Sequence, residues 1–312
     1  MKVIMVSANK APADKLPLAV RKNVRDGWEN RKVDLEAQLL TLLGVAWTFE
    51  VNPLAIFPYA EERSYGYDSL GDCIFAYCDN FIGNLRSFLE KHGDSGKIEL
   101  NRVCPTHVVT LVASTKFRYC GTAVTDGRLS LLFHPEKLGT NINDLAQNLI
   151  ETLSTAPQPD GASYLSFAAR RSIETDYDAK IGAYLEKAQK TLQNPELKFE
   201  PGFNDIGAKL QAGKDVREDW ETNLGLLAIG YYEGFLDILA SEKFAEDDML
   251  RDGLAEAAPQ GVVKLRIVDT LTTDQTGHNE IVIDDGALVI QTTPENWGTN
   301  IHYATSKLVD IL

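Results

Sequence analysis

The chain has 312 residues, of which 44% are hydrophobic, an ordinary globular composition that leaves room for two domains with sizeable cores. Its formal net charge of −14 argues against nucleic acid or an anionic membrane as partner, because both require a basic surface. The acidity either serves solubility or marks a face that meets a basic partner.

The N-terminal segment, residues 1–7, carries one charge and an apolar stretch too short for a secretion signal, so we expect a first strand there. A signal already removed from the mature chain stays open. The longest apolar runs, such as residues 226–229, fall far short of the roughly 20 residues that a membrane-spanning helix needs.

All four cysteines lie in the first half of the chain and none in the second. A disulfide or metal cage that belonged to a repeated fold should recur in both halves, so we expect free, mostly buried thiols. One disulfide between Cys104 and Cys120 is the alternative. We therefore predict a cytoplasmic protein with no metal site.

The first half predicts a helix, a strand, a second helix, a strand, a β-hairpin and a closing helix. Apolar residues recur at helical spacing before Gly44 and before Gly93, which are expected to end the two long helices. Asp126-Gly127 supplies the positive φ angles of a tight hairpin turn. The expected ranges are 18–44, 46–51, 69–92, 107–112, a hairpin around 126–127 and 141–153.

The second half repeats the first. The sequence Pro-Glu-x-x-Gly-Thr-Asn-Ile occurs at 135–142 and again at 294–301, and residues 122–153 match 281–312 at 11 of 32 positions. Unrelated sequences would match at roughly one position in sixteen. We therefore predict an α+β fold made by tandem duplication of one helix-strand-helix-strand-hairpin-helix unit, with the two copies related by a pseudo-twofold axis.

The expected domains are residues 1–153, the first repeat with its N-terminal strand, and residues 170–312, the second repeat. Residues 154–169 should form the linker, because 154–161 include two prolines and a glycine. The second repeat should contain helices at 172–193 and 218–243, strands at 197–201, 262–269, 279–284 and 287–291, a turn at Asp285-Gly286 and a last helix.

Most shared residues favour a structural role. The Pro-Glu-x-x-Gly-Thr-Asn-Ile motif suits a strand end, a sharp turn and a helix cap, although an exposed helix N-terminus could also bind an anion. The aromatic pairs Tyr77/Tyr231 and Phe81/Phe235 suit a core.

Few of the remaining polar residues suggest catalysis. The shared acids Glu50/Glu200 and Asp79/Glu233 would be the candidates for a catalytic carboxylate pair, but nothing in the sequence places them together. A nucleophilic Cys–His pair could be drawn from Cys104 or Cys120 with His107 or His134. Because the chain has four cysteines and five histidines, such a pairing arises easily by chance and is weak evidence for catalysis. No catalytic residue and no cofactor is predicted.

The two halves differ most in the loop between the first strand and the middle helix. In the first half this loop, residues 56–68, interleaves four aromatic residues with charges, and loops on a rigid scaffold are where binding residues collect. The alternative is a loop that folds back and covers the helices. The candidate binding residues are Phe57, Tyr59, Glu61, Glu62, Arg63, Tyr65 and Tyr67.

We therefore expect a soluble, acidic binding or interaction protein without a conventional catalytic motif. Its partner would be a protein, basic if the acidic surface is what it meets, with a small-molecule ligand left open. The alternative is a hydrolase-like enzyme whose site lies in one copy or at the joint between copies.

Overall fold

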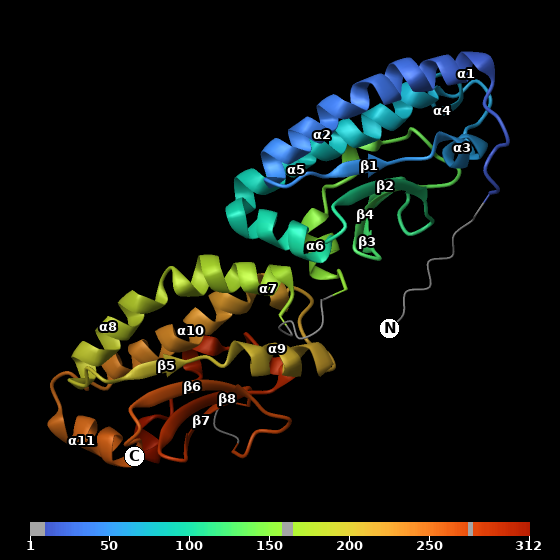
Figure 1. Cartoon of the computed structure of the whole chain (residues 1–312). Coiled ribbons are helices and arrows are strands. Elements are labelled where there is room, and N and C mark those ends of the chain that lie inside the picture. Colours follow the sequence, from blue (N-terminus) through green and yellow to red (C-terminus); the bar gives the residue numbers. More distant parts are fainter. Residues whose placement is uncertain (1–9, 158–164, 274–276) are drawn as a thin grey trace. The chain divides into compact units, whose positions relative to one another are not determined.

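The structure is a computed structural model of the whole chain that describes residues 10–157, 165–273 and 277–312 (Figure 1). The chain divides into two compact units, Met1–Ala162 and Ser163–Leu312. Each unit combines helices with one mixed four-stranded sheet, so the fold is α+β. The expected N-terminal strand at 1–7, and residues 158–164 of the expected linker, lie outside the described residues.

The first unit opens with one continuous helical segment that ends at Gly44, which adopts the left-handed conformation. This segment contains α1 (Leu18–Asn23), a π-helical stretch (Val24–Glu29) and α2 (Asn30–Leu43). The predicted helix at 18–44 is confirmed, and the π-helical stretch was not foreseen. The following elements are β1 (Thr48–Glu50), α3 (Pro53–Ile56), α4 (Tyr65–Asp68), α5 (Leu70–Val103), β2 (Val108–Ala113), β3 (Cys120–Thr125), β4 (Arg128–Phe133) and α6 (Leu149–Ser154).

One predicted boundary in the first unit is confirmed with an addition, and another is wrong. Gly93 breaks the middle helix as expected, with a non-helical φ of 54°, but the chain continues beyond this kink in a second helical stretch of α5 that buries Leu100 and Val103 and was not predicted. The closing helix at 141–153 is shorter than expected. Residues Ile142–Asp144 form a 3-10 turn, and only the last six residues, up to Ser154, are α-helical.

The second unit has the same order of strands and long helical segments as the first. Its elements are α7 (Phe167–Ser172), a π-helical stretch (Ile173–Asp178), α8 (Ile181–Leu192), β5 (Lys198–Glu200), α9 (Phe203–Ala212), α10 (Trp220–Ser241), α11 (Asp248–Ala257), β6 (Val262–Ile267), β7 (Asn279–Asp284) and β8 (Ala287–Thr292). The expected last helix is instead a series of 3-10 turns at Pro294–Asn296, Ile301–Tyr303 and Val309–Ile311.

The two sheets have the same strand order and directions. The orders are β1-β2-β4-β3 and β5-β6-β8-β7, with two parallel pairs and one antiparallel hairpin in each. Both hairpins turn at the predicted Asp-Gly pair, where Asp126, Gly127, Asp285 and Gly286 all have positive φ angles.

In each unit the two long helical segments lie on one side of the sheet (Figure 1). Alternate strand residues pack toward the helices; in the second unit they include Val263, Leu265, Leu288 and Ile290, which share a core with Tyr232 and Phe235 of α10. The residues between them point to the opposite side, which we call the outer face of each sheet.

In each unit the first helical segment crosses the middle helix closely at the start of its π-helical stretch. The Asn23 side-chain oxygen accepts a hydrogen bond from the Gly71 N–H (2.6 Å), and the Ser172 hydroxyl accepts one from the Gly225 N–H (3.0 Å). A Cβ atom on either glycine would collide with backbone of the crossing helix. Both units therefore use a glycine and a polar side chain at the same crossing.

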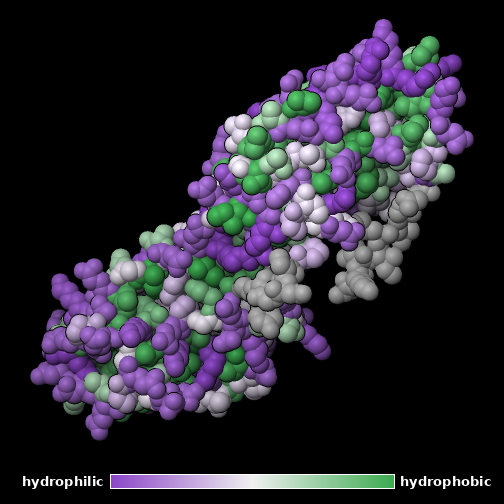
Figure 2. Space-filling model, in the orientation of Figure 1, coloured by the Kyte–Doolittle hydropathy of each residue, from purple (hydrophilic) through white to green (hydrophobic). Residues whose placement is uncertain are grey.

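Within the described residues, α10 is long and apolar enough to cross a membrane by length and composition. The expectation that no segment reaches this limit is wrong for α10, but 67% of its apolar stretch is buried within the chain. This burial identifies α10 as the central helix of the second unit's core. On the face shown in Figure 2, hydrophobic residues form small separate patches among hydrophilic ones.

Candidate functional site

The expected recognition loop at 56–68 contains three short helical turns rather than irregular chain. Tyr59 is only 6% exposed, its ring centroid lies 5.4 Å from that of Phe133, and its hydroxyl accepts a hydrogen bond from the Lys10 N–H (2.9 Å). Tyr59 therefore belongs to the core of the first unit as well as to the segment.

The other candidate residues of this segment lie nearer the surface. The rings of Phe57 and Tyr67 are half-buried and pack together at 5.1 Å, while Tyr65 is 48% exposed. The three charged candidates, Glu61, Glu62 and Arg63, are all exposed. The structure thus brings Phe57 and Tyr67 together and leaves the charges at the tip, where binding by them stays a prediction.

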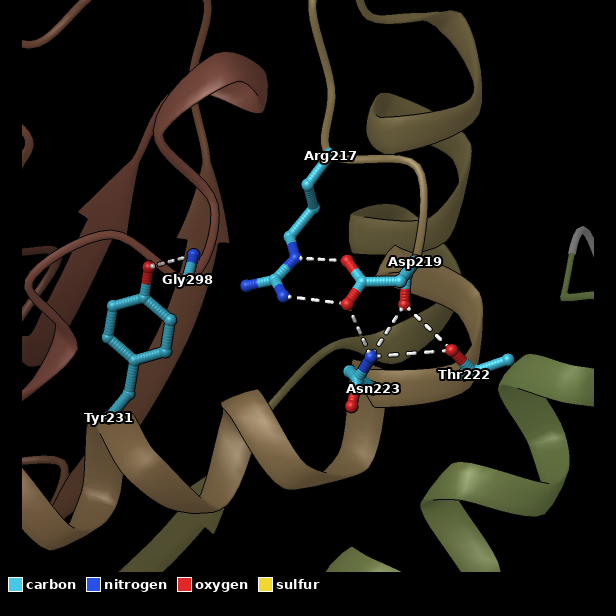
Figure 3. A network of polar contacts seen from close by, with 6 residues as sticks. All are labelled: Arg217, Asp219, Thr222, Asn223, Tyr231 and Gly298. Carbon is cyan, nitrogen blue, oxygen red and sulfur yellow. Dashed lines mark hydrogen bonds and ion pairs between the residues drawn. The ribbon is translucent and has the colours of Figure 1, made fainter.

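Two shared features of the sequence meet in each unit. The Tyr77 hydroxyl accepts a hydrogen bond from the Gly139 N–H (3.0 Å), and the Tyr231 hydroxyl accepts one from the Gly298 N–H (3.3 Å, Figure 3). Both glycines have φ angles above 80°, so the repeated motif is a tight turn fixed by the repeated tyrosine. No α-helix begins directly after this turn, which removes the basis for an anion site at a helix N-terminus.

A different side chain covers the motif glycine in each unit. In the first unit the ring of Tyr65 lies against Gly139, and in the second the Arg217 guanidinium lies against Gly298. Arg217 is held by two hydrogen bonds to Asp219, at 2.6 and 2.9 Å (Figure 3). This hydrogen-bonded pairing raises the pKa of Arg217 and lowers the pKa of Asp219. The diverged loop therefore contacts the conserved turn in both units.

The outer face of the second unit carries a groove of about 570 Å³ between α9 and β6. Its lining includes four carboxylates and three cations: Glu200, Asp205, Asp284, Asp285, Lys209, Lys264 and Arg266. Two of the cations are already paired, Arg266 with Asp284 at 2.5 Å and Lys209 with Asp269 at 2.7 Å.

The first unit carries a groove of about 440 Å³ on its outer face. It lies between α3 and β2, and its lining is mostly apolar: Ala55, Ile56, Tyr59, Leu111, Val112, Ala113 and Phe133, with Lys10, Ala11 and Pro12 at one side. Val112 is 42% exposed, so an apolar side chain is available at the groove surface.

The two grooves occupy the same place in their units. The register of β1 on β2 matches that of β5 on β6, which pairs Glu50 with Thr110 and Glu200 with Lys264. Six lining positions then correspond: 55, 56, 59, 111, 112 and 113 with 205, 206, 209, 265, 266 and 267. The isoleucine and leucine are retained, whereas alanine, tyrosine and valine in the first groove are replaced by Asp205, Lys209 and Arg266.

A row of polar side chains across three strands holds Arg266 in place. Gln291 of β8 lies beside Arg266 of β6. The side-chain oxygen of Gln291 accepts two hydrogen bonds from the arginine, at 2.9 and 2.6 Å. The Gln291 amide in turn donates to Glu280 on β7. The equivalent row in the first unit is Val112, Leu132 and Gly121, so the polar row is particular to the second unit.

Glu280 is fully buried and anchors the loop before β7. Its carboxylate accepts four hydrogen bonds of 2.6–3.0 Å from the backbone N–H and hydroxyl groups of Thr272 and Thr273. Burial alone would raise the pKa of Glu280, but these bonds and the one from Gln291 lower it to about 2. In the first unit the ring of Phe117 covers Gly121 at the equivalent position. Sequence alone gave no signal of this change from an aromatic to an ionic anchor.

The remaining sequence candidates are separated or unreactive. Glu50 pairs with Arg128 at 2.5 Å, whereas its counterpart Glu200 lines the charged groove. All four cysteines are free and buried, as expected, and the alternative disulfide is absent. Burial raises the pKa of Cys104 to about 12 and that of Cys120 to about 11, which keeps both as unreactive thiols.

The described residues contain no cluster of three or more His, Cys, Asp or Glu side chains that could hold a metal ion. Comparison with known proteins adds no family: the chain matches no family model, no curated protein and no solved structure. The candidate site is therefore argued from the paired grooves alone.

Proposed function

We propose that the protein is a non-enzymatic binding protein whose two outer-face grooves recognise different parts of a protein partner. The observation that carries this proposal is the pairing of the grooves: six lining positions correspond, yet one groove is apolar and the other is charged. The two units keep the groove at the same place but line it with different side chains. Each groove can therefore bind a chemically different part of one partner.

The charges of the second groove favour a basic side chain. Asp284 and Asp269 neutralise Arg266 and Lys209, which leaves Glu200, Asp205 and Asp285 facing a single further cation, Lys264. Opposite charges attract strongly across a partly enclosed surface. The second unit as a whole also has 26 acidic against 14 basic residues, a formal charge of −12. Lysine or arginine on the partner is the chemistry that fits.

The lining of the second groove does not suit a hydrolase with a serine, threonine, cysteine or histidine nucleophile. Among its described residues there is no serine, threonine, cysteine, histidine or tyrosine, so it offers no hydroxyl, thiol or imidazole for nucleophilic catalysis. This composition supports binding over a hydrolase of that kind, and hydrolysis by a carboxylate pair such as Glu200 and Asp205 is the enzyme alternative for this groove.

The segment 56–68 extends the first groove. Ile56 and Tyr59 line the groove, and the exposed Glu61, Glu62 and Arg63 follow directly in the chain. We propose that a partner seated on Val112 also meets this tip, with Tyr65 as the exposed aromatic contact.

The charged groove is tested with labelled peptides of ten residues, one rich in lysine and arginine and one with glutamate at the same positions. Fluorescence anisotropy should show binding of the basic peptide only, and Glu200→Gln with Asp205→Asn should weaken it at least about tenfold. Glu50→Gln, at the position equivalent to Glu200, is the matched control and should leave the affinity unchanged. Equal binding of the acidic peptide, or an equal loss in the control, would contradict the proposal.

We also propose that the two units arose by tandem duplication and are related by a pseudo-twofold axis. The shared strand order, the two π-helical stretches, the glycine crossings and the tyrosine–glycine bonds support a common origin. An experimental structure of the whole chain tests both parts. Units that fail to superpose would refute the duplication, and a screw or translational relation would refute the twofold.

A further inference from the structure

Two helix faces of this chain carry opposite charge around an exposed apolar side chain. The first is on α1 and the π-helical stretch that follows it, where Leu18, Arg21, Lys22 and Arg25 recur at i, i+3, i+4 and i+7 and line one surface hollow. We call it the basic face. All four residues are exposed, and Leu18 is 74% exposed.

The second face lies on α11 of the other unit. Asp248, Asp252 and Glu256 recur at i, i+4 and i+8, with Met249 beside them. We call it the acidic face. Its four side chains are exposed while Leu254 of the same helix is buried in the core, so this face points to solvent. Met249 is 76% exposed.

Leu18 and Met249 are the two most exposed large hydrophobic side chains among the described residues. Their surroundings are complementary: each is flanked by three charges of one sign. Arg25 is already paired with Asp26 at 2.7 Å, but Arg21 and Lys22, and all three carboxylates of the acidic face, have no ion pair within the described part of the chain. Unpaired charges next to a solvated apolar side chain are available for a contact.

The net charges of the two units differ in the same direction as the charges of the two faces. The first has 17 basic and 19 acidic residues, a formal charge of −2, against −12 for the second. A second copy approaching with its acidic unit toward the basic face therefore meets attraction, whereas two acidic units repel each other. This asymmetry favours one orientation of approach.

We propose that the protein self-associates head to tail, with the basic face of one copy docked on the acidic face of the next. Leu18 and Met249 bury against each other or against the partner helix, and Arg21 and Lys22 meet Asp248 and Asp252. The contact joins two different surfaces, so it is heterologous and leaves one free face at each end of a dimer. Chains or closed rings then form as the concentration rises. This inference is independent of the grooves.

The experiment is sedimentation velocity of the full chain over about 5 to 500 µM protein, in about 50 mM and 500 mM NaCl. Wild type should show a weight-average mass that rises with concentration at low salt and falls back toward the monomer at high salt, because exposed ion pairs are screened. The variant Arg21→Glu/Lys22→Glu, with two acidic faces, should remain monomeric. So should Asp248→Lys/Asp252→Lys, with two basic faces.

Complementary charge reversal distinguishes this contact from a general effect of net charge. A chain that carries all four substitutions, and a 1:1 mixture of the two double variants, should regain association. Lys187→Glu/Lys190→Glu, on α8, changes the net charge as the first double variant does and should still associate. Melting temperatures near that of wild type confirm that each variant is folded.

Three results would overturn the inference. They are a wild-type chain that is monomeric throughout, double variants that associate as wild type does, and a four-substitution chain that stays monomeric. If a monomeric wild type is nonetheless retained on a poly-glutamate support through Arg21 and Lys22, the basic face serves a separate acidic protein instead.

Discussion

The hydroxyl of Tyr231 accepts a hydrogen bond from the backbone N–H of Gly298, 67 residues away in the chain. The same hydroxyl donates to the side-chain oxygen of Asn279 on β7 (3.2 Å). One buried phenol thus joins the middle helix, an edge strand and the closing turn of the second unit. In the first unit Tyr77 makes the equivalent bond to Gly139, while Cys120 replaces Asn279 and donates to the Asn141 carbonyl instead.

Removing these hydroxyls should destabilise the units unequally. Tyr231→Phe removes the bonds to both the Gly298 N–H and the Asn279 oxygen, whereas Tyr77→Phe removes the bond to the Gly139 N–H. A buried polar group left unpaired costs about 1–3 kcal/mol. Urea unfolding should therefore show a loss in this range for both variants, larger for Tyr231→Phe. Equal stability of both variants and wild type would show that these bonds contribute nothing.

The motif glycine should resist substitution even by alanine. Gly298 has a φ of 83°, and a Cβ atom there would lie 2.6 Å from the Arg217 guanidinium nitrogen. We expect Gly298→Ala to cost about 1–2 kcal/mol from the left-handed backbone, plus displacement of Arg217 from Asp219. Gly253→Ala is the matched control. A Cβ there meets open space within α11, so it should stabilise the helix by roughly 0.5–1 kcal/mol. Thermal unfolding should therefore show a lower melting temperature for Gly298→Ala and a higher one for Gly253→Ala than for wild type.

Tyr59 and Tyr65 of the segment 56–68 should differ in their contribution to stability. Tyr59 is buried against Phe133, so Tyr59→Ala should cost about 3 kcal/mol or more, as truncation of a buried aromatic side chain does. Tyr65 is 48% exposed, so Tyr65→Ala should lower the melting temperature far less. Differential scanning calorimetry of both variants checks this. Similar losses would mean that Tyr65 is as much a core residue as Tyr59.

The sequence predicts the elements well where local chemistry decides them. The hairpins follow from Asp126-Gly127 and Asp285-Gly286, and Gly44 ends its helix as expected. Prediction failed where tertiary packing overrode the local signal. Gly93 breaks the helix as expected, but the chain continues into a second helical stretch that buries Leu100, and the local signal did not indicate this stretch.

The candidate site was less accessible to sequence reasoning. The shared tyrosine and the shared motif glycine were both recognised, but nothing local indicates that they touch, because they lie more than 60 residues apart. The grooves depend on strand register: Asp205 and Arg266 become neighbours of one cavity only when α9 and β6 are placed together. Arg266 stands at the position of Val112, and the consequence of this difference for the groove follows only from the outer face of the folded sheet.

All four cysteines should be free but slow to react in the folded protein. Burial raises the pKa of Cys73 and Cys104 to about 12, that of Cys120 to about 11, and that of Cys78 well above its ordinary value. Near pH 8 the thiolate, which is the reactive form, is then scarce. A colorimetric thiol assay should detect little reaction in native buffer and four thiols after unfolding without reductant. Only two thiols in the unfolded chain would indicate a disulfide and an oxidising compartment.

The carboxylate of Glu280 should make the second unit sensitive to acid. Its pKa in the folded chain, about 2, lies below the ordinary value of 4.5, so the ionised form favours folding. This contribution is complete above pH 4.5 and is lost as the pH falls toward 2.

In Glu280→Gln the contribution is absent at every pH. The difference in free energy of unfolding between wild type and Glu280→Gln should therefore be largest above pH 4.5 and narrow steadily below it. Glu256→Gln, on the exposed face of α11, is the control, and its effect on the free energy of unfolding should be much smaller because its side chain is exposed. Urea unfolding at a series of pH values between 2 and 7 measures both differences, and parallel curves for wild type and Glu280→Gln would show that Glu280 does not anchor the loop through its charge.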